Sequence, residues 1–127
     1  MPQRIIIRRT LETPIERKAV ALILDNLGVR SLKLQLSKDT GWPDRLFLIP
    51  GGRPLLIEFK RPGDNPKIKQ EYVHDLLRSL GYAVKVVDDA EDAYEAVAEA
   101  LRRARSGQPL LSGPDTLDSS FRTKEGR

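Results

Sequence analysis

The sequence predicts one α/β domain, a mixed β-sheet flanked by helices, with its elements in the order α-β-β-β-α-β-α. Segments with a helical apolar period alternate with short strand-like segments, and Gly or Pro stands at most of the boundaries. At 127 residues the chain has the length of one domain. We expect this domain to span residues 1–105, because residues 106–127 have the Ser-, Gly- and Pro-rich composition of a flexible or partner-ordered tail.

A first helix is predicted from Pro14, with Gly28 as its C-terminal cap. Thr13 can act as the N-cap, Pro14 suits the first helical position, and Glu16 stands where a capping box requires an acidic residue. The apolar face of this helix consists of Ile15, Ala19, Ile23 and Leu27.

Three strands are predicted next, over residues 29–36, 45–49 and 55–61. Residues 29–36 alternate between leucines and polar side chains. The Pro-Gly-Gly-Arg-Pro turn of residues 50–54 joins the second and third strands into a β-hairpin. The apolar surroundings of the third strand favour a central position, covered on both faces.

A second helix is predicted over residues 67–80, a fourth strand over 82–87, and a third helix from 88 to about 105. The third helix has acidic residues early and arginines late, the order that the helix dipole favours. The buried face of the second helix is expected to contain Ile68, Tyr72 or Val73, Leu76, Leu77 and Leu80.

Composition narrows the classes of function. The net charge of +4 fits either ordinary solubility or an anionic partner such as nucleic acid. The chain contains no cysteine, which excludes thiolate metal sites and fits a cytoplasmic protein. No apolar run is long enough to span a membrane, and no glycine-rich phosphate loop supports a nucleotide cofactor. His74 is the single histidine, expected at a surface or half-buried position, so a histidine-rich metal site is excluded.

The third strand carries an anomaly, because Glu58 and Lys60 share one face of a strand that should lie in the core. An exposed edge hairpin with a solvated ion pair would also explain them. The position of Asp44 favours a metal site over a solvated ion pair. Asp44 lies 7.5 residues and Glu58 lies 6.5 residues from the midpoint of Gly51-Gly52, so the hairpin should bring both carboxylates together. Such a pair suits Mg²⁺ or Mn²⁺, with Lys60 beside the attacking water or the developing oxyanion.

The order of these motifs resembles a known family. Residues 41–44, Gly-Trp-Pro-Asp, followed by a glycine turn and Glu58-Phe59-Lys60, resemble the PD-(D/E)XK signature of the restriction-endonuclease-like superfamily. Over about residues 11–90, the chain more closely resembles the virus-type replication-repair nuclease family, written VRR-NUC. Further segments that carry this resemblance are Pro50-Gly51-Gly52, Pro62-Gly63, Pro66, Gln70 and residues 76–82.

The resemblance implies a restriction-endonuclease-like core and a role for each matching residue. Asp44, Glu58 and the backbone carbonyl of Phe59 would hold the metal, Lys60 would assist the nucleophile, and Gln70 would position water or the scissile phosphate. Members of the family also carry a glutamate on the first helix. Glu12 and Glu16 both match that position, and Glu16 is equally explained as a capping residue, so either could complete the site.

The resemblance further implies a structure-selective DNA endonuclease that acts on branched DNA, with four-way (Holliday) junction resolution by a homodimer as the leading interpretation. A flap or nicking repair nuclease and a catalytically silent DNA-binding module are the alternatives. Trp42 is expected either to stack on a base or to pack against the sheet. The residues expected to contact nucleic acid are Arg8, Arg9, Arg17, Lys38, Trp42 and Arg45.

Overall fold

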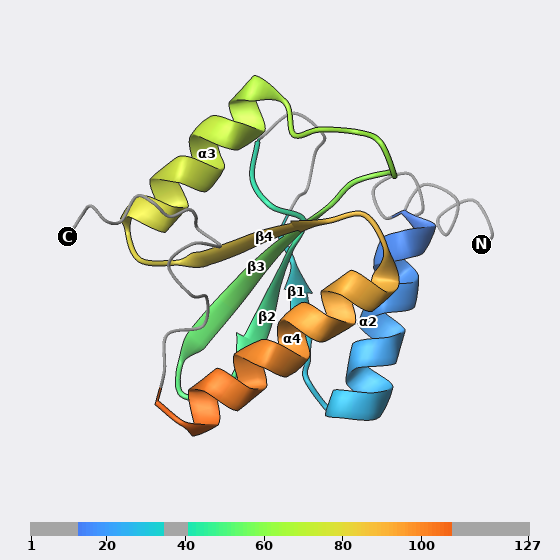
Figure 1. Cartoon of the computed structure of the whole chain (residues 1–127), viewed down its shortest axis with the longest axis vertical. Helices are drawn as coiled ribbons and strands as arrows, with labels where there is room; N and C mark the ends of the chain where they lie inside the picture. Colours follow the sequence, from blue (N-terminus) through green and yellow to red (C-terminus); the bar gives the residue numbers. More distant parts are fainter. Residues whose placement is uncertain (1–12, 35–40, 108–127) are drawn as a thin grey trace, which may run out of the picture.

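The computed structural model describes residues 13–34 and 41–107 (Figure 1). Along the chain it contains α2 (Pro14–Leu27), β1 (Ser31–Lys33), β2 (Arg45–Ile49), β3 (Arg53–Phe59), α3 (Ile68–Ser79), β4 (Ala83–Val87) and α4 (Ala90–Arg105). The predicted order α-β-β-β-α-β-α is confirmed over these residues. No helix within them is long and apolar enough to cross a membrane.

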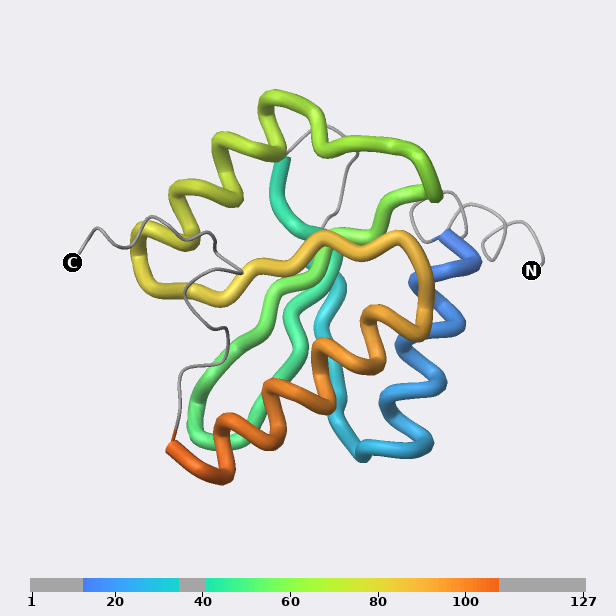
Figure 2. Tube along the Cα trace, in the orientation of Figure 1, coloured from blue at the N-terminus to red at the C-terminus, as the bar shows by residue number. Residues whose placement is uncertain are grey.

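The four strands form one mixed sheet in the order β1-β2-β3-β4. β1 and β2 pair antiparallel, as do β2 and β3, whereas β3 and β4 run parallel. Figure 2 follows the chain from β3 through α3 to β4, the crossover that a parallel pair requires. β3 therefore lies in the middle of the sheet, as its apolar sequence predicted, and residues 55–59 are all buried.

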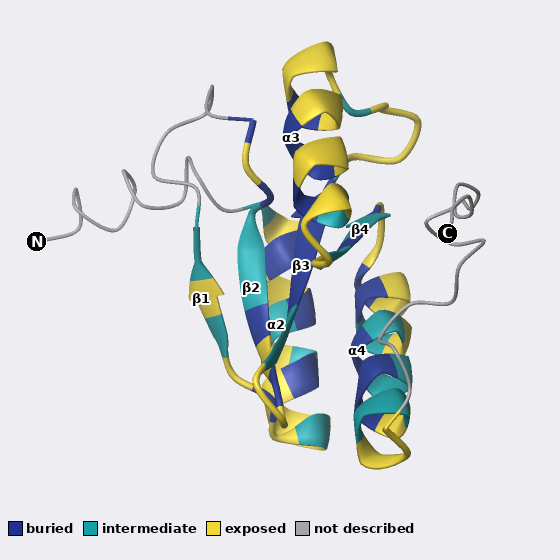
Figure 3. Cartoon of the chain, turned by 90° about the vertical axis from the view of Figure 1, so that its left-hand side faces the viewer, coloured by how far each residue is buried: buried dark blue, intermediate teal, exposed yellow. Residues whose placement is uncertain are grey.

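Helices cover both faces of this sheet. α2 and α4 lie side by side on one face, and α3 lies on the other (Figures 1 and 3). The larger core fills the α2 and α4 side, with Phe47, Ile57 and Ile23 fully buried in it. The core under α3 is smaller, and its buried members are Leu56, Val73, Leu77 and Val84.

The turn between β2 and β3 is shorter than the predicted turn of residues 50–54. Ile49 pairs with Arg53, so the turn contains only residues 50–52 and is centred on Gly51. β3 consequently begins at Arg53 instead of residue 55 and ends at Phe59 instead of residue 61. Pro54 is tolerated in β3 because the pairing with β4 begins at Leu55, so no neighbour on that side needs a donor from Pro54.

The strand predicted over residues 29–36 is shorter than expected. β1 comprises Ser31–Lys33, although Arg30 and Leu34 extend its backbone hydrogen bonds to β2, and residues 35 and 36 lie outside the described ranges. Leu32 is 55% exposed and pairs with Leu46, which packs against the core under α3, so Leu32 lies on the α3 face of the sheet. Lys33 lies on the opposite face of the sheet, where its ammonium donates to Glu16 of α2. This contact brings a lysine to the edge of the site described next.

The predicted buried face of α3 is wrong for most of its residues. Val73 and Leu77 are buried as expected, but the other inward-facing residues are the polar Gln70 and His74. The remaining apolar residues are exposed along the outer side of the helix (Figure 3), namely Ile68, Tyr72, Leu76 and, at the C-cap, Leu80. A polar site beneath α3 explains the difference, because its inner face must supply hydrogen bonds as well as apolar contact.

Candidate active site

Asp44 and Glu58 lie beside each other at the open end of the hairpin. The paired register ends at Arg45 and Ile57, and Asp44 and Glu58 are the residues that adjoin this last pair on the two strands. Asp44 is held through its backbone, since its N–H donates to the Ile57 carbonyl at 3.1 Å. Its Oδ2 also accepts the backbone N–H of Phe59 at 2.8 Å. The backbone of β3 therefore fixes the Asp44 carboxylate, and Glu58 of β3 supplies the second carboxylate.

Glu58 belongs to a three-residue hydrogen-bonded network with Gln70 and Lys60. The Gln70 amide nitrogen donates to Glu58 Oε2 at 2.8 Å, and the Lys60 ammonium donates to Gln70 Oε1 at 2.6 Å. Lys60 Nζ also lies 3.3 Å from Glu58 Oε2. The backbone N–H of Lys67 donates to Gln70 Oε1 at 2.9 Å, which fixes the orientation of the amide at the start of α3.

Burial raises the pKa of both carboxylates, and the Asp44 charge adds to the shift of Glu58. Burial, followed by the nearby Asp44 charge, raises the pKa of Glu58 to about 7, even though Lys60 and Gln70 oppose this shift. Burial likewise raises the pKa of Asp44, opposed by its hydrogen bond from Phe59 and by the Lys33 and Lys60 charges. Two adjacent carboxylates with raised pKa values are a pair that a cation would stabilise in the ionised form.

The donor set fits a hard divalent cation. Glu58 Oε1 is buried and has no hydrogen-bond partner, although Oε2 of the same carboxylate is satisfied. A buried, unsatisfied carboxylate oxygen costs free energy unless it binds a proton, water or metal. Carboxylate and carbonyl oxygens are the ligands that Mg²⁺ and Mn²⁺ prefer. Asp44, Glu58 and the Phe59 carbonyl are the groups at this end of the hairpin that could supply them.

Glu16 reaches the same region from α2 but is held by cations. It is 1% exposed, accepts from Lys33 Nζ at 2.9 Å, and accepts from Arg45 at 3.1 Å. Lys33 Nζ also lies 3.9 Å from Asp44 Oδ1, so this lysine stands between the two carboxylates. Burial raises the pKa of Glu16, partly offset by Lys33. Thr13 caps α2 by accepting the N–H of Glu16, while the Glu16 carboxylate itself turns to the sheet.

A second acidic cluster lies outside this site. Within the described ranges, one group of three or more potential metal ligands comes within 4.8 Å, and it comprises the exposed Asp88, Asp89 and Asp92. Asp89 is the N-cap of α4, with its carboxylate accepting the N–H of Asp92. Helix capping accounts for this cluster. Glu16 is not gathered with Asp44 and Glu58 into such a group.

The residues expected to contact nucleic acid differ in their exposure to solvent. Trp42 is 43% exposed beside the site, and Arg17 is exposed on α2. The Arg45 side chain is only 13% exposed and donates to Glu16 and Ser31, so it is turned into the protein. Residues expected from the sequence that lie outside the described ranges are Glu12, Arg8, Arg9 and Lys38.

The sequence did not predict the burial of His74 or the contacts of Lys33. His74 is 2% exposed instead of lying at the surface, with Nε2 unpartnered, and burial lowers its pKa to about 4. Its position one turn after Gln70 was the available signal, because residues four apart share a helix face. Lys33 bridges Glu16 and Asp44, a pairing across long sequence separations that no local pattern encodes.

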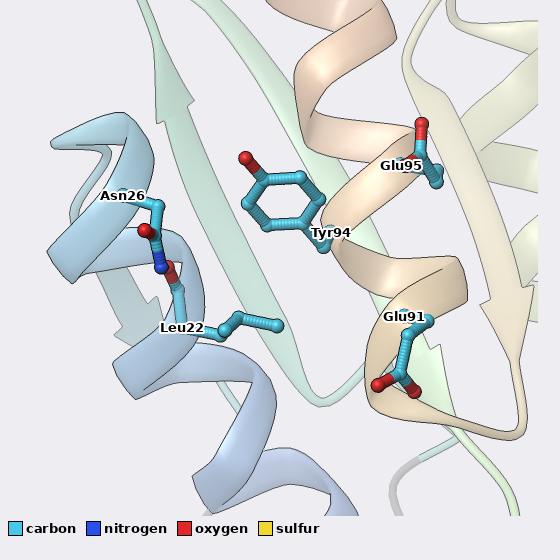
Figure 4. A pocket seen from close by; sticks show the side chains of 5 residues that line it. All are labelled: Leu22, Asn26, Glu91, Tyr94 and Glu95. Atoms are coloured by element: carbon cyan, nitrogen blue, oxygen red, sulfur yellow. The ribbon is translucent and has the colours of Figure 1, made fainter.

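A hollow of about 260 Å³ lies between α2 and α4 (Figure 4). Leu22 and Tyr94 face each other across it, while Asn26, Glu91 and Glu95 form its rim. The Asn26 amide donates to the Leu22 carbonyl of its own helix at 2.9 Å. None of these residues belongs to the carboxylate site.

Comparison with known proteins agrees with this geometry. "Putative nuclease p44" of Acyrthosiphon pisum secondary endosymbiont phage 1 is 32% identical over 80 residues, which are 63% of this chain and 85% of the relative. A solved structure described as "VRR_NUC domain" superposes with a TM-score of 0.55 at 25% identity, covering 65% of this chain and 89% of its own. No family model matches the chain. The relative, the structural likeness and the mixed sheet together establish that the chain belongs to the VRR-NUC family of nucleases and has its restriction-endonuclease-like fold.

Proposed function

We propose that this nuclease hydrolyses phosphodiester bonds in branched DNA with Mg²⁺ or Mn²⁺, resolving four-way junctions as a homodimer. The observation that carries the chemistry is the joining of Asp44, Glu58 and Lys60 at one end of the β2–β3 hairpin, with Glu58 Oε1 buried and unpartnered. A decayed nuclease fold that only binds DNA tends to lose one of these three groups, and this chain retains all of them.

Asp44, Glu58 and the Phe59 carbonyl would hold the metal, which lowers the pKa of a bound water and neutralises charge that develops on a phosphoryl group. Lys60 would lie beside the scissile phosphate, where its ammonium stabilises the oxyanion. Gln70 orients both partners, because its amide nitrogen donates to Glu58 and its oxygen accepts from Lys60. Glu16 would act from a distance, by holding Lys33 near Asp44.

The exposed apolar residues of α3 support the homodimer. Ile68 is 85% exposed and Tyr72 is 70% exposed, one turn apart on a helix whose inner face carries Gln70. Contiguous exposed apolar side chains are typical of protein–protein contacts. Two copies joined by a two-fold axis would present two identical sites, which matches the symmetry of a four-way junction. The phage origin of the relative favours a role in phage or bacterial DNA processing inside the cell.

A cleavage assay tests this proposal. A labelled four-way junction incubated with the protein and Mn²⁺ should give paired, symmetric nicks, whereas a linear duplex of the same sequence should stay intact. Chelation of the metal should stop the reaction. If no nucleic acid is cleaved in any divalent metal, the protein is a silent DNA-binding module instead.

Lys60→Ala is the matched variant for this assay. Loss of the ammonium should lower the cleavage rate by about 100-fold or more, since removal of one donor to a developing oxyanion typically costs that much. Junction binding, measured by gel shift in Ca²⁺, should remain. Unfolding of Lys60→Ala, seen by circular dichroism, would mean that Lys60 serves as a structural ion pair.

A further inference from the structure

Gly41 lies in the loop that leads to Asp44, and its backbone packs against the helix that carries Gln70. An added Cβ at Gly41 would lie 2.9 Å from Lys69 Cγ, 3.0 Å from the Lys69 carbonyl oxygen and 3.1 Å from Val73 Cγ2. Carbon atoms do not approach a backbone oxygen or another carbon so closely without displacement. An alanine at position 41 would therefore require Lys69 and Val73, in the first turns of α3, to move away from the loop by a few tenths of an ångström.

This contact is unusual among the glycines of the described residues. Seven of them have positive φ angles, and at five of the seven an added Cβ would meet nothing within 4 Å. Gly51 would meet only Arg53 side-chain atoms at 3.9 Å or more. Gly41, with φ of 82°, needs both the left-handed backbone and the missing side chain. All seven described glycines have the left-handed backbone, but among them Gly41 alone has neighbouring atoms close enough to hinder an added Cβ.

Both ends of the contact connect directly to the site. Lys69 immediately precedes Gln70, whose amide joins Glu58 and Lys60. Three residues after Gly41, Asp44 is fixed to the sheet through its N–H to Ile57 and its Oδ2 from Phe59. Pro43 between them is fully buried. Displacement of α3 at Lys69 would consequently move Gln70 relative to Asp44 and Glu58.

We infer that Gly41 is a positioning residue, which sets the spacing between the α3 part of the site and the hairpin part. This inference rests on the proposed nuclease activity. The core under α3 has only four buried apolar residues, so it offers little resistance to a shift of this helix. The Gly41 contact and the Gln70 hydrogen bonds thus define where the first turn of α3 lies.

The test compares Gly41→Ala with Gly52→Ala. Gly52 has a φ of 71° and would meet nothing within 4 Å, so its substitution imposes the same backbone strain without the steric contact. Gly41→Ala should lower kcat by about tenfold or more, as small misplacements of catalytic groups do, and leave the Kd for the junction within about threefold. Gly52→Ala should keep kcat within about twofold of wild type. Equal loss in both variants, or full activity in Gly41→Ala, would overturn the inference.

A readout without cleavage separates this inference from the proposed function. The side-chain amide resonances of Gln70, followed by ¹⁵N NMR, should shift in Gly41→Ala and stay unchanged in Gly52→Ala, even if wild type cleaves no DNA. Unchanged Gln70 resonances in Gly41→Ala would refute the positioning role whatever the activity.

Combination with Lys69→Ala keeps the test decisive if Gly41→Ala is insoluble. Lys69→Ala removes the Cγ atom nearest to the added methyl group. The double variant should then be soluble and keep most of the kcat of Lys69→Ala alone. An insoluble double variant, or a kcat far below that of Lys69→Ala, would mean that backbone strain, and not the contact with α3, is the cause.

Discussion

Glu58 is the most strongly perturbed carboxyl group of the site, and its two oxygens have different surroundings. Oε2 accepts from Gln70 and lies near Lys60, whereas Oε1 is buried without a partner. A proton or a metal ion on Oε1 would relieve the cost of that burial. The two should therefore compete for the same residue, and metal binding should release protons near neutral pH.

A pH dependence of stability follows for the metal-free protein. The pKa of Glu58 rises from 4.5 to about 7 on folding. The stabilisation from its bound proton is fully present below the unfolded pKa and is lost as pH rises through the folded pKa. A shift of this size corresponds to roughly 3 kcal/mol. Between pH 5 and 8, wild type should lose that much more unfolding free energy than Glu58→Gln.

Urea denaturation in the presence of a chelator measures both proteins at the two pH values. If wild type and Glu58→Gln lose the same unfolding free energy between pH 5 and 8, Glu58 has an ordinary pKa. Addition of Mn²⁺ should restore wild-type stability at pH 8 and have little effect on Glu58→Gln, because the variant lacks the ionised ligand.

At the residue level, the sequence predicted much of the site geometry. Hairpin counting predicted that Asp44 lies near Glu58, and strand alternation predicted that Lys60 shares the Glu58 face. In the structure the Asp44 charge acts on Glu58, and Lys60 Nζ lies 3.3 Å from Glu58 Oε2. These relationships are local, within one hairpin. The contacts of Glu16 with Lys33 and Arg45 depend on how α2 packs on the sheet, which no local pattern encodes. The functional roles of these residues remain predictions.

At the level of elements, α2 is fastened to the sheet by a buried charge cluster. Glu16 accepts from Lys33 of β1 and from Arg45 of β2, so one carboxylate links three elements. Removal of one partner from a buried ion pair leaves the other charges uncompensated, which is strongly destabilising. The same cluster holds Lys33 close to Asp44, so its charge also acts at the end of the hairpin that carries Asp44 and Glu58.

Glu16→Ala should accordingly lower the unfolding free energy by about 3 kcal/mol. Glu99 is the matched control, because its carboxylate also pairs with two arginines, Arg102 and Arg103, but on the exposed side of α4. Glu99→Ala should change stability little. Thermal and urea denaturation of the two variants make the comparison. Similar stability losses in both would mean that burial adds nothing to the Glu16 cluster.

Element boundaries were predicted well where caps mark them, as at Thr13 and Gly28, whereas α4 begins at Ala90, two residues after its predicted start. The buried face of α3 was predicted wrongly because an apolar stripe normally faces the core. Here Gln70 and His74 occupy the inner face, since the polar Glu58 and Lys60 lie beneath them. The hydrogen bonds of Gln70 with Glu58 and Lys60 account for the polar inner face of this one helix.

At the level of the whole molecule, the exposed residues of α3 determine the expected assembly. Sedimentation velocity at micromolar concentration should show a dimer. Replacement of Ile68 and Tyr72 by Glu should give a monomer, because two charges would be buried in the contact. Leu32→Glu is the control, since Leu32 is 55% exposed on β1, away from α3. A monomeric wild type would favour a flap or nicking nuclease.

The hairpin has a further consequence, for the order of folding. Asp44 and Glu58 adjoin the open end of one hairpin, whose strands are joined by a three-residue turn, so their encounter needs only a short chain closure. Gln70 reaches them only after α3 has crossed over to the parallel pairing of β3 with β4, a slower event. We expect the carboxylate pair to assemble first and Gln70 last. In pulsed hydrogen exchange, the amides of β2 and β3 should become protected before those of α3 and β4, and the reverse order would contradict this sequence of events. The protein would then pass through an intermediate that already binds metal but cannot yet cut.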